Sequence, residues 1–356
     1  MTERKAVIPL LKPYMPPLPE MESILHSGRL AYGDYTKQFE EALKAYFGTP
    51  YVIATGSFHL AIAVALTTLG IVPGDSVVAS PMACLASTQP FLSSGLSVRF
   101  ADVDPHTGTL SPDAVRRRIT PETKAIVHNH FCGYPGYIDE INAIGRECGI
   151  PVIDDGIECF GSEYKGRLIG NVGTDVTVFS LTAARFCNCI EGGVVIFKDK
   201  ALYEKSLLVR DCGIDRPRFR DSLGEISPDC DISLIGYSAM MSNVNGYIGS
   251  MQMQALPGLL QKHRAQADTW RKTLPSLGDY QPLDRPDTLP NFWVYGLLAE
   301  NKVETIKSFR ERGYYASGVH IRNDLYSAFG KQDVPLPGVD DFYGRFVALP
   351  CGWWMT

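Results

Sequence analysis

Short apolar strands alternate with helix-forming segments from residue 51 onward, and this alternation restricts the possible folds more than any other feature of the sequence. Alternation of this kind is typical of a mostly parallel β-sheet wrapped by helices. We therefore predict an α/β fold. Strands are expected at 51–54, 76–80, 98–102, 125–130, 152–155, 176–179 and 194–197, and helices at 36–47, 57–69, 138–148 and from Pro112, with Ser111 as its cap.

The second half of the sequence contains longer helical stretches and one long polar loop. With 356 residues, the chain is expected to form one large domain and a smaller appendage. The predicted elements are a helix after Asp199 to about residue 210, a surface loop at 212–231, helical structure at 245–274, a strand at 292–298 and a helix at 303–312.

Composition and charge exclude several classes of partner. Hydrophobic residues make up 45% of the chain, charged residues 21%, and the formal net charge is -5, so no basic face for nucleic acid and no polybasic membrane anchor are expected. No apolar run approaches the length of a membrane span. The start of the chain carries charges and then prolines where a signal peptide would have its apolar core. A cytoplasmic protein is therefore predicted.

The nine cysteines do not have the regular spacings of a secreted disulfide framework. We interpret them as reduced thiols. One alternative is that some of them converge with His130 on a zinc ion. The spacings lack the paired C-x-x-C of zinc sites, so no metal site is predicted. The cysteines in question, all at or near predicted strand ends, are Cys84, Cys132, Cys159, Cys187 and Cys189.

In parallel sheets the ligand lies beyond the carboxyl ends of the strands. The residues that follow each predicted strand are therefore candidates for a binding or catalytic site. These segments are 55–57, 81–87, 129–133, 154–159 and 180–185.

The stretch at 175–197, DVTVFSLTAARFCNCIEGGVVIF, places a polar segment between two β-rich runs, as in a loop that forms a pocket wall. It resembles the cofactor-lysine loop of the DegT/DnrJ/EryC1/StrS family, in which F-S-F-H-A-T-K is followed by E-G-G. Members of that family are pyridoxal-phosphate (PLP) enzymes that mostly aminate keto-sugars carried on nucleotides. Arg185 stands in the place of the family's lysine.

The resemblance covers nearly the whole chain. It implies an aspartate-aminotransferase-like fold (PLP fold type I), with a large α/β domain and N-terminal arm at 1–245 and a small C-terminal α/β domain at 246–356. It also implies a homodimer with shared active sites. Family members usually continue into one more amphipathic helix after the point that corresponds to residue 356, so that helix is either lost or lies beyond this sequence.

Several positions match residues that the family uses at its cofactor. Gly56 and Ser57 resemble the phosphate cup, although Ser57 would equally serve as an ordinary helix N-cap. Ser180 matches a phosphate-binding serine, or else is a strand-end hydroxyl that bonds the backbone. Asp155 matches the aspartate that pairs with the pyridinium nitrogen, with a turn aspartate as the alternative. His130 matches a histidine near the cofactor, with a hydrogen-bonded structural residue as the alternative.

Five positions depart from the family pattern. Cys84 replaces an aromatic ring that stacks on the cofactor, and Glu158 replaces a His or Gln beside the ring. Ser238 and Met240 replace an Asn and a basic residue that reach the partner subunit's cofactor. Arg185 is the fifth, and five changes together indicate that the cofactor site has been rebuilt.

The arginine at position 185 determines whether the cofactor can be bound covalently. A guanidinium stays protonated and cannot form an aldimine, so no covalently bound cofactor is predicted. Its planar fork suits either an anionic ligand or an ion pair with Glu158 or Asp155. The expected substrate is small and either anionic or sugar-like.

Three functional classes stay open. The first is an enzyme of nucleotide-sugar, polysaccharide or natural-product biosynthesis that makes no internal aldimine and acts through Arg185, Asp155, Glu158 and His130. The second is an enzyme that holds PLP or pyridoxamine phosphate (PMP) noncovalently, with an aminotransferase-like or 3-dehydratase-like reaction. The third is a non-catalytic paralogue that binds a ligand or a partner subunit.

Overall fold

A computed structural model describes residues 7–332 and 334–355 of the chain. Its centre is a seven-stranded sheet in the order β1-β9-β8-β5-β4-β2-β3. The predicted α/β fold with a mostly parallel central sheet is confirmed, since β2 pairs in parallel with β3 and β4, β4 with β5, and β5 with β8. Only β9 runs antiparallel to its neighbours β8 and β1.

The strands of this sheet lie within a few residues of the predicted ranges, because each is a short run of buried apolar residues between turns. Their carboxyl ends bring the predicted pocket segments to one edge of the sheet. The strands are β1 Val52–Thr55, β2 Ser76–Ala79, β3 Ser97–Phe100, β4 Thr123–Asn129, β5 Val152–Asp155, β8 Val176–Ser180 and β9 Gly193–Phe197.

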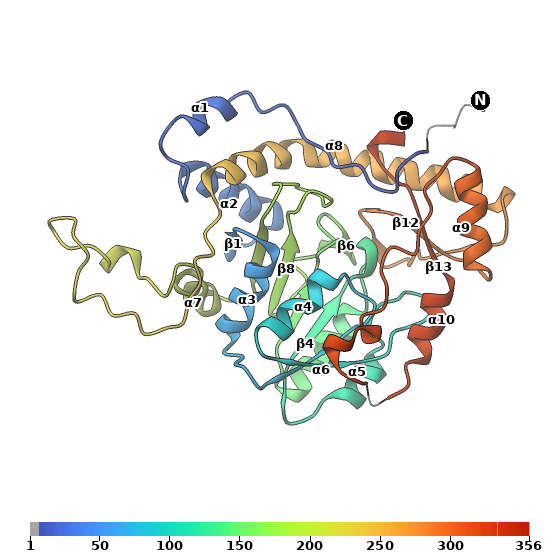
Figure 1. Cartoon of the computed structure of the whole chain (residues 1–356), viewed down its shortest axis with the longest axis horizontal. Helices are drawn as coiled ribbons and strands as arrows, with labels where there is room; N and C mark the ends of the chain where they lie inside the picture. Colours follow the sequence, from blue (N-terminus) through green and yellow to red (C-terminus); the bar gives the residue numbers. More distant parts are fainter. Residues whose placement is uncertain (1–6, 333, 356) are drawn as a thin grey trace.

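Helices cover the sheet and form most of the periphery (Figure 1). The predicted helices are present, and Gly48 and Gly149 end two of them in the left-handed conformation that glycine permits. The α-helices are α1 Met21–Leu25, α2 Asp34–Phe47, α3 Phe58–Leu69, α4 Leu85–Ser93, α5 Pro112–Arg118, α6 Ile138–Cys148, α7 Lys200–Arg210, α8 Asn243–Thr273, α9 Lys302–Glu311 and α10 Pro337–Arg345.

Two small sheets complete the fold: β10 (Gln281–Pro282), β12 (Tyr295–Leu298) and β13 (Phe346–Leu349) in one, and β11 (Thr288–Leu289), β6 (Glu163–Tyr164) and β7 (Arg167–Leu168) in the other. The strand predicted at 292–298 is therefore too long at its start. Phe292 has a φ of 53°, which no regular strand accepts, so pairing begins only at Tyr295.

The long helix α8 runs along one side of the molecule, from α2 to the small sheet of β12 and β13 (Figure 1). It packs closely on α2, where a side chain at Gly246 would lie 2.5 Å from Thr36 Cα. The predicted boundary between residues 245 and 246 falls near the start of α8, and this boundary stays a prediction. The polar loop predicted at 212–231 extends away from the body of the molecule between α7 and α8 (Figure 1).

Within residues 7–332 and 334–355, no helix is both long and apolar enough to cross a membrane. The charged start at residues 1–6, which contributed to the prediction that no signal peptide is present, lies outside the described residues.

Candidate functional site

Glu158 lies just beyond the carboxyl end of β5 and is almost completely buried. Its carboxylate accepts a hydrogen bond from the Cys132 backbone amide at 2.8 Å and another from His320 Nε2 at 2.8 Å. The guanidinium of Arg185 approaches the same carboxylate, with Nη2 3.3 Å from Oε1. A buried carboxylate is thus surrounded by donors from three segments that are distant in the sequence.

Arg185 projects from the loop between β8 and β9 into this pocket, and only 9% of its side chain is exposed. Its guanidinium lies over the indole of Trp293, 4.4 Å from the ring centroid, and the indole Nε1 donates to Ala184 O at 2.7 Å. Cys84 Sγ is 3.8 Å from Nη2. Of the two acidic partners that the sequence suggested for Arg185, the structure shows an ion pair with Glu158 and none with Asp155 among the described residues.

The electrostatics of the pocket favour an ionised Glu158. Burial works against the charge, but His320 and Arg185 outweigh it and lower the pKa of Glu158. Burial and the nearby Glu158 raise the pKa of the Cys84 thiol and, to a larger extent, that of Cys132. The pocket therefore pairs one carboxylate with one guanidinium and keeps both thiols protonated at neutral pH.

Asp155 ends strand β5 and is buried. Asn129, at the end of the neighbouring strand β4, donates to one carboxylate oxygen at 2.7 Å, and the Ile157 amide donates to the other at 3.2 Å. Burial raises the pKa of Asp155 in spite of these bonds. Asp155 is thus held rigidly at the strand end where a ligand is expected.

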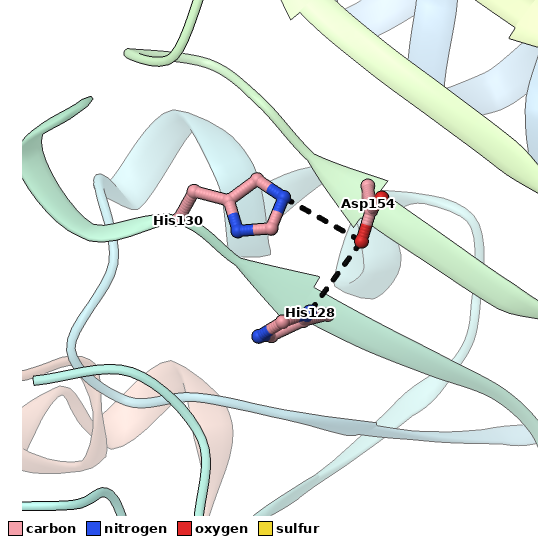
Figure 2. Close-up of side chains that lie close together, drawn as sticks. All are labelled: His128, His130 and Asp154. Carbon is pink, nitrogen blue, oxygen red and sulfur yellow. Dashed lines mark ion pairs between the residues drawn. The ribbon is translucent and has the colours of Figure 1, made fainter. Parts of the chain in front are cut away.

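His130 points to a different carboxylate, that of Asp154 (Figure 2). Asp154 Oδ1 lies 3.4 Å from His128 Nδ1 and 3.5 Å from His130 Nε2, and all three side chains are buried. The Gly136 amide donates to His130 Nδ1 at 3.2 Å, so the proton of a neutral His130 ring is on Nε2 and faces Asp154. The two imidazoles lower the pKa of Asp154 against the effect of burial. This arrangement matches the structural alternative for His130.

The residues of the predicted phosphate cup already have local partners. The Gly56 amide donates to Ala239 O at 2.9 Å, and Ser57 is the N-cap of α3, where its Oγ accepts from the Leu60 amide. Ser180 Oγ bonds Thr182 Oγ1 at 3.0 Å and accepts from the Thr182 amide. The N-cap and strand-end alternatives therefore describe what these side chains do in this structure.

Residues 17–356 match the sequence model of the DegT/DnrJ/EryC1/StrS aminotransferase family. The chain belongs to this family. The match starts at residue 17, so it covers every residue of the site described above, including the C-terminal segment that carries His320.

Solved structures agree with this assignment. The sugar aminotransferase CalS13 from Micromonospora echinospora is 30% identical, with 98% of this chain and 96% of that chain covered at a TM-score of 0.91. AtS13 from Actinomadura melliaura is 31% identical, with 99% and 95% covered at a TM-score of 0.90. PseC from Helicobacter pylori, an aminotransferase involved in the biosynthesis of pseudoaminic acid, shares the fold at 23% identity and a TM-score of 0.84, with 98% and 94% covered. The predicted aspartate-aminotransferase-like architecture, PLP fold type I, is confirmed.

Ser238 and Met240, the two positions predicted to reach a partner subunit, lie near the start of α8. Met240 forms an isolated bridge with Thr55, and Ser238 forms one with Asp211. Ser238 is exposed. Neither contacts Arg185 or Glu158 through a hydrogen bond or ion pair among the described residues, so their predicted role toward a partner subunit stays a prediction.

The five cysteines considered for zinc do not converge in this DegT family member. Cys159 Sγ is 4.0 Å from His130 O, Cys187 Sγ is 3.6 Å from Met253 Sδ, and Cys189 Sγ is 3.4 Å from Cys187 O. Among the described residues, no potential metal-ligand grouping contains two cysteines. The nine cysteines are free thiols, as predicted.

Sequence reasoning missed His320 and Trp293. His320 is 162 residues from Glu158 in the chain, and its surrounding motif, GVHIRND, matched the family only as part of the small C-terminal segment. Its ring lies parallel to that of Trp293, with the centroids 6.3 Å apart, so the imidazole that binds Glu158 lies next to the indole that contacts Arg185. The sequence signal that could have indicated His320 as a site residue is the run His-Ile-Arg-Asn at 320–323, in which three polar side chains lie close together.

Proposed function

We propose that this chain is a DegT family member in which Arg185 occupies the position of the cofactor lysine and which works without an internal aldimine. Arg185 lies in the loop between β8 and β9, beyond the end of a central strand, where the sequence resembles the family's lysine loop. A guanidinium does not lose its proton at ordinary pH and is not a nucleophile. Covalent attachment of PLP at this position is therefore excluded by chemistry.

The contact between Arg185 and Glu158 is the observation that carries the proposal. A buried guanidinium that is stacked on Trp293 and paired with a carboxylate has its planar fork held in one orientation. A small anionic or sugar-like substrate is proposed to take over this fork through bidentate hydrogen bonds, while His320 and the Cys132 amide continue to hold Glu158. The substrate would thereby replace Glu158 as the partner of the Arg185 guanidinium.

The proposed setting is biosynthesis of nucleotide sugars, polysaccharides or natural products. CalS13, at 30% identity and nearly full coverage, is a sugar aminotransferase, which supports a sugar-like substrate. The proposal includes a homodimer in which Ser238 and Met240 approach the partner's pocket, a large domain at 1–245, a small domain at 246–356, and a cytoplasmic location. Asp155, Glu158 and His320 would contact or orient the substrate from the large and small parts of the chain.

A second candidate function is noncovalent binding of PLP or PMP, and the geometry of Asp155 favours it. Its buried carboxylate stands at the end of β5, held by Asn129, as a partner for a pyridinium nitrogen requires. The other contacts fit a cofactor poorly, since the Gly56 amide is used by Ala239 and Cys84 offers no ring to stack. We therefore place this function second.

Borohydride reduction in the presence of added PLP, followed by peptide mass spectrometry, tests the proposal. No stable mass increment is expected on any residue of the pocket. Lys12 is the lysine to inspect, because it lines the same cavity as Arg185 together with Trp293 and Trp353. A reduced adduct on Lys12 would show that a lysine from the N-terminal arm replaces the missing amine, and the proposal would be wrong.

The Arg185→Lys variant separates the two candidate functions. We expect it to stay colourless with PLP, because Cys84, Glu158, Ser238 and Met240 also differ from the family pattern. Yellow aldimine absorbance together with amination of a keto-sugar would instead show that the pocket is a cofactor site that lacks one part. Noncovalent cofactor binding by the unchanged protein would appear as an absorbance band of bound PLP or PMP without any reducible adduct.

A further inference from the structure

Cys132, Glu158 and His320 form a grouping of three potential metal ligands. The Cys132 Sγ, a Glu158 carboxylate oxygen and a His320 ring nitrogen all lie within 4.8 Å of one another. Cys132 and Glu158 are buried, and 15% of the His320 side chain is exposed. Thiolate, imidazole and carboxylate are the three ligand types that zinc takes from proteins, and catalytic zinc sites use three protein ligands and leave one position open.

We propose that Cys132, Glu158 and His320 bind a divalent cation of the zinc type, with the remaining coordination position available to water or a substrate oxygen. The site belongs to the pocket of the proposed function but does not depend on it, because metal binding requires neither substrate nor PLP. It also differs from the zinc alternative that the sequence suggested, since only one of those five cysteines takes part.

The distances suit a shared metal ion. His320 Nε2 and Glu158 Oε1 are 2.8 Å apart. Two ligand atoms at about 2.0 Å from a tetrahedral zinc ion are roughly 3.3 Å apart, so a small outward movement makes room for the ion. On binding, the Cys132 thiol loses its proton to solvent and the proton of a neutral His320 moves from Nε2 to Nδ1. The ion then replaces the hydrogen bond between His320 and Glu158.

The backbone at Cys132 supports a special position for this thiol. Cys132 has a φ of 53°, in the left-handed region that residues with a side chain seldom adopt. It lies in a short 3-10 turn directly after β4, and its own amide binds Glu158. Strain of this kind persists where the surrounding structure imposes it, and here it directs a thiol to the carboxylate.

The second grouping of potential ligands, His128, His130 and Asp154 (Figure 2), is less suited to a metal ion. The Gly136 amide donates to His130 Nδ1, which fixes the proton of the neutral ring on Nε2, the atom that would have to bind the metal. A metal ion there would force two N–H groups against each other. His320 Nε2, by contrast, shares its proton only with the carboxylate that would become its fellow ligand.

Arg185 opposes the metal ion because its guanidinium is 3.3 Å from Glu158 Oε1. The binding of a cation therefore requires the guanidinium to move away from the carboxylate, and the two positive charges compete for Glu158. Removing the charge in Arg185→Gln is expected to tighten metal binding on the order of tenfold or more, given the strength of charge interactions in a partly buried site. This competition distinguishes a site at Glu158 from metal binding elsewhere on the protein.

Cobalt(II) titration of the chelator-treated, full-length protein tests the site through its spectrum. We expect one equivalent to give the ligand-field absorption of a four-coordinate cobalt ion and a thiolate-to-cobalt charge-transfer band. The charge-transfer band should disappear in Cys132→Ser. The control is Cys159→Ser, because Cys159 is equally buried and directly follows Glu158 in the chain but belongs to neither grouping. That variant should keep the full spectrum.

Zinc competition against a chromophoric chelator gives a second measurement in case Cys132→Ser fails to fold. His320→Gln changes a partly exposed ring, and circular dichroism can verify its fold. We expect it to lose at least about tenfold in zinc affinity, because even the outer-shell partners of metal ligands typically contribute about 10–100-fold. The proposal is wrong if the unchanged protein gives no cobalt spectrum, if the charge-transfer band survives in Cys132→Ser, or if folded His320→Gln binds zinc as before.

Discussion

The ion pair between Arg185 and Glu158 is shielded from water, since 9% of the Arg185 side chain and 2% of the Glu158 side chain are exposed. Removing one partner of a buried pair leaves the other charge uncompensated and costs about 3–5 kcal/mol. We expect Arg185→Ala to lower the free energy of unfolding by an amount near the lower end of this range, because His320 still donates to Glu158. Denaturant unfolding at neutral pH measures the change.

The same loss should depend on pH in a defined direction. The folded-state pKa of Glu158 is lowered by His320 and Arg185 in spite of burial, so the stabilisation is fully present above the ordinary pKa of a glutamate and disappears as pH falls through the folded-state value. The difference between Arg185→Ala and the unchanged protein should therefore shrink in acid. Lys37→Ala is the control: its pair with Asp34 has side chains 61% and 75% exposed, and its loss should stay within about 0.5 kcal/mol at any pH. Equal losses for the two variants would contradict the prediction.

Single residues were predictable from the sequence where a strand end determined their position. Asp155 and Glu158 follow β5, and Arg185 follows β8, so parallel-sheet geometry placed them in one region. The sequence left open which acid pairs with Arg185, because both follow the same strand and only the turn after Asp155 directs Glu158 to the guanidinium. His320 was unpredictable because its contact with Glu158 depends on how the C-terminal part of the chain packs.

The N-terminal ends of α3 and α5 provide a matched test of helix capping. Ser57 is the N-cap of α3 and its side chain accepts from the Leu60 amide, whereas Ser111 occupies the N-cap of α5 without a side-chain hydrogen bond. Ser57→Ala is expected to reduce the free energy of unfolding by about 1 kcal/mol, because a partly buried helix start loses its acceptor. Ser111→Ala should cost clearly less. Urea unfolding of both variants measures this, and equal losses would show that the hydrogen bond at Ser57 contributes nothing.

Elements with a strong pattern were predictable, and short ones were not. The helix at Ile138–Cys148 and the strand at Val152–Asp155 lie where the sequence placed them, because each has a clear apolar period and a turn at its end. The two-residue strands β6, β7, β10 and β11 are too short to show any period. Ser111 occupies the predicted cap position, but its side chain makes no capping hydrogen bond.

The packing of α8 on α2 can be tested at two glycines on α8. A Cβ at Gly246 would lie 2.5 Å from Thr36 Cα, so Gly246→Ala has to push the helices apart. This is expected to lower the free energy of unfolding by about 1–3 kcal/mol. A Cβ at Gly258, on the same helix, would meet no atom within 4 Å, so Gly258→Ala should stabilise by up to about 1 kcal/mol through helix propensity. Thermal unfolding of the two variants should shift in opposite directions, and shifts of the same sign would contradict this account.

The whole architecture was predictable because two independent signals agreed, the alternation of strands and helices and the resemblance to the DegT family. The contact between the C-terminal segment and the pocket was not predictable, since no local pattern in the sequence specifies a contact between residues 162 positions apart. The domain boundary depends on the same relation, and it too stays a prediction.

Glu158 receives its donors from Cys132, Arg185 and His320, and the last of these comes 162 residues after Glu158. Contacts of such long sequence separation close late during folding, because the chain loses more entropy in forming large loops. During synthesis, Glu158 and Arg185 leave the ribosome well before His320. The pocket therefore reaches its final arrangement only after the C-terminal segment has been synthesised and has packed against it. A chain released before that point contains Glu158 and Arg185 but lacks His320.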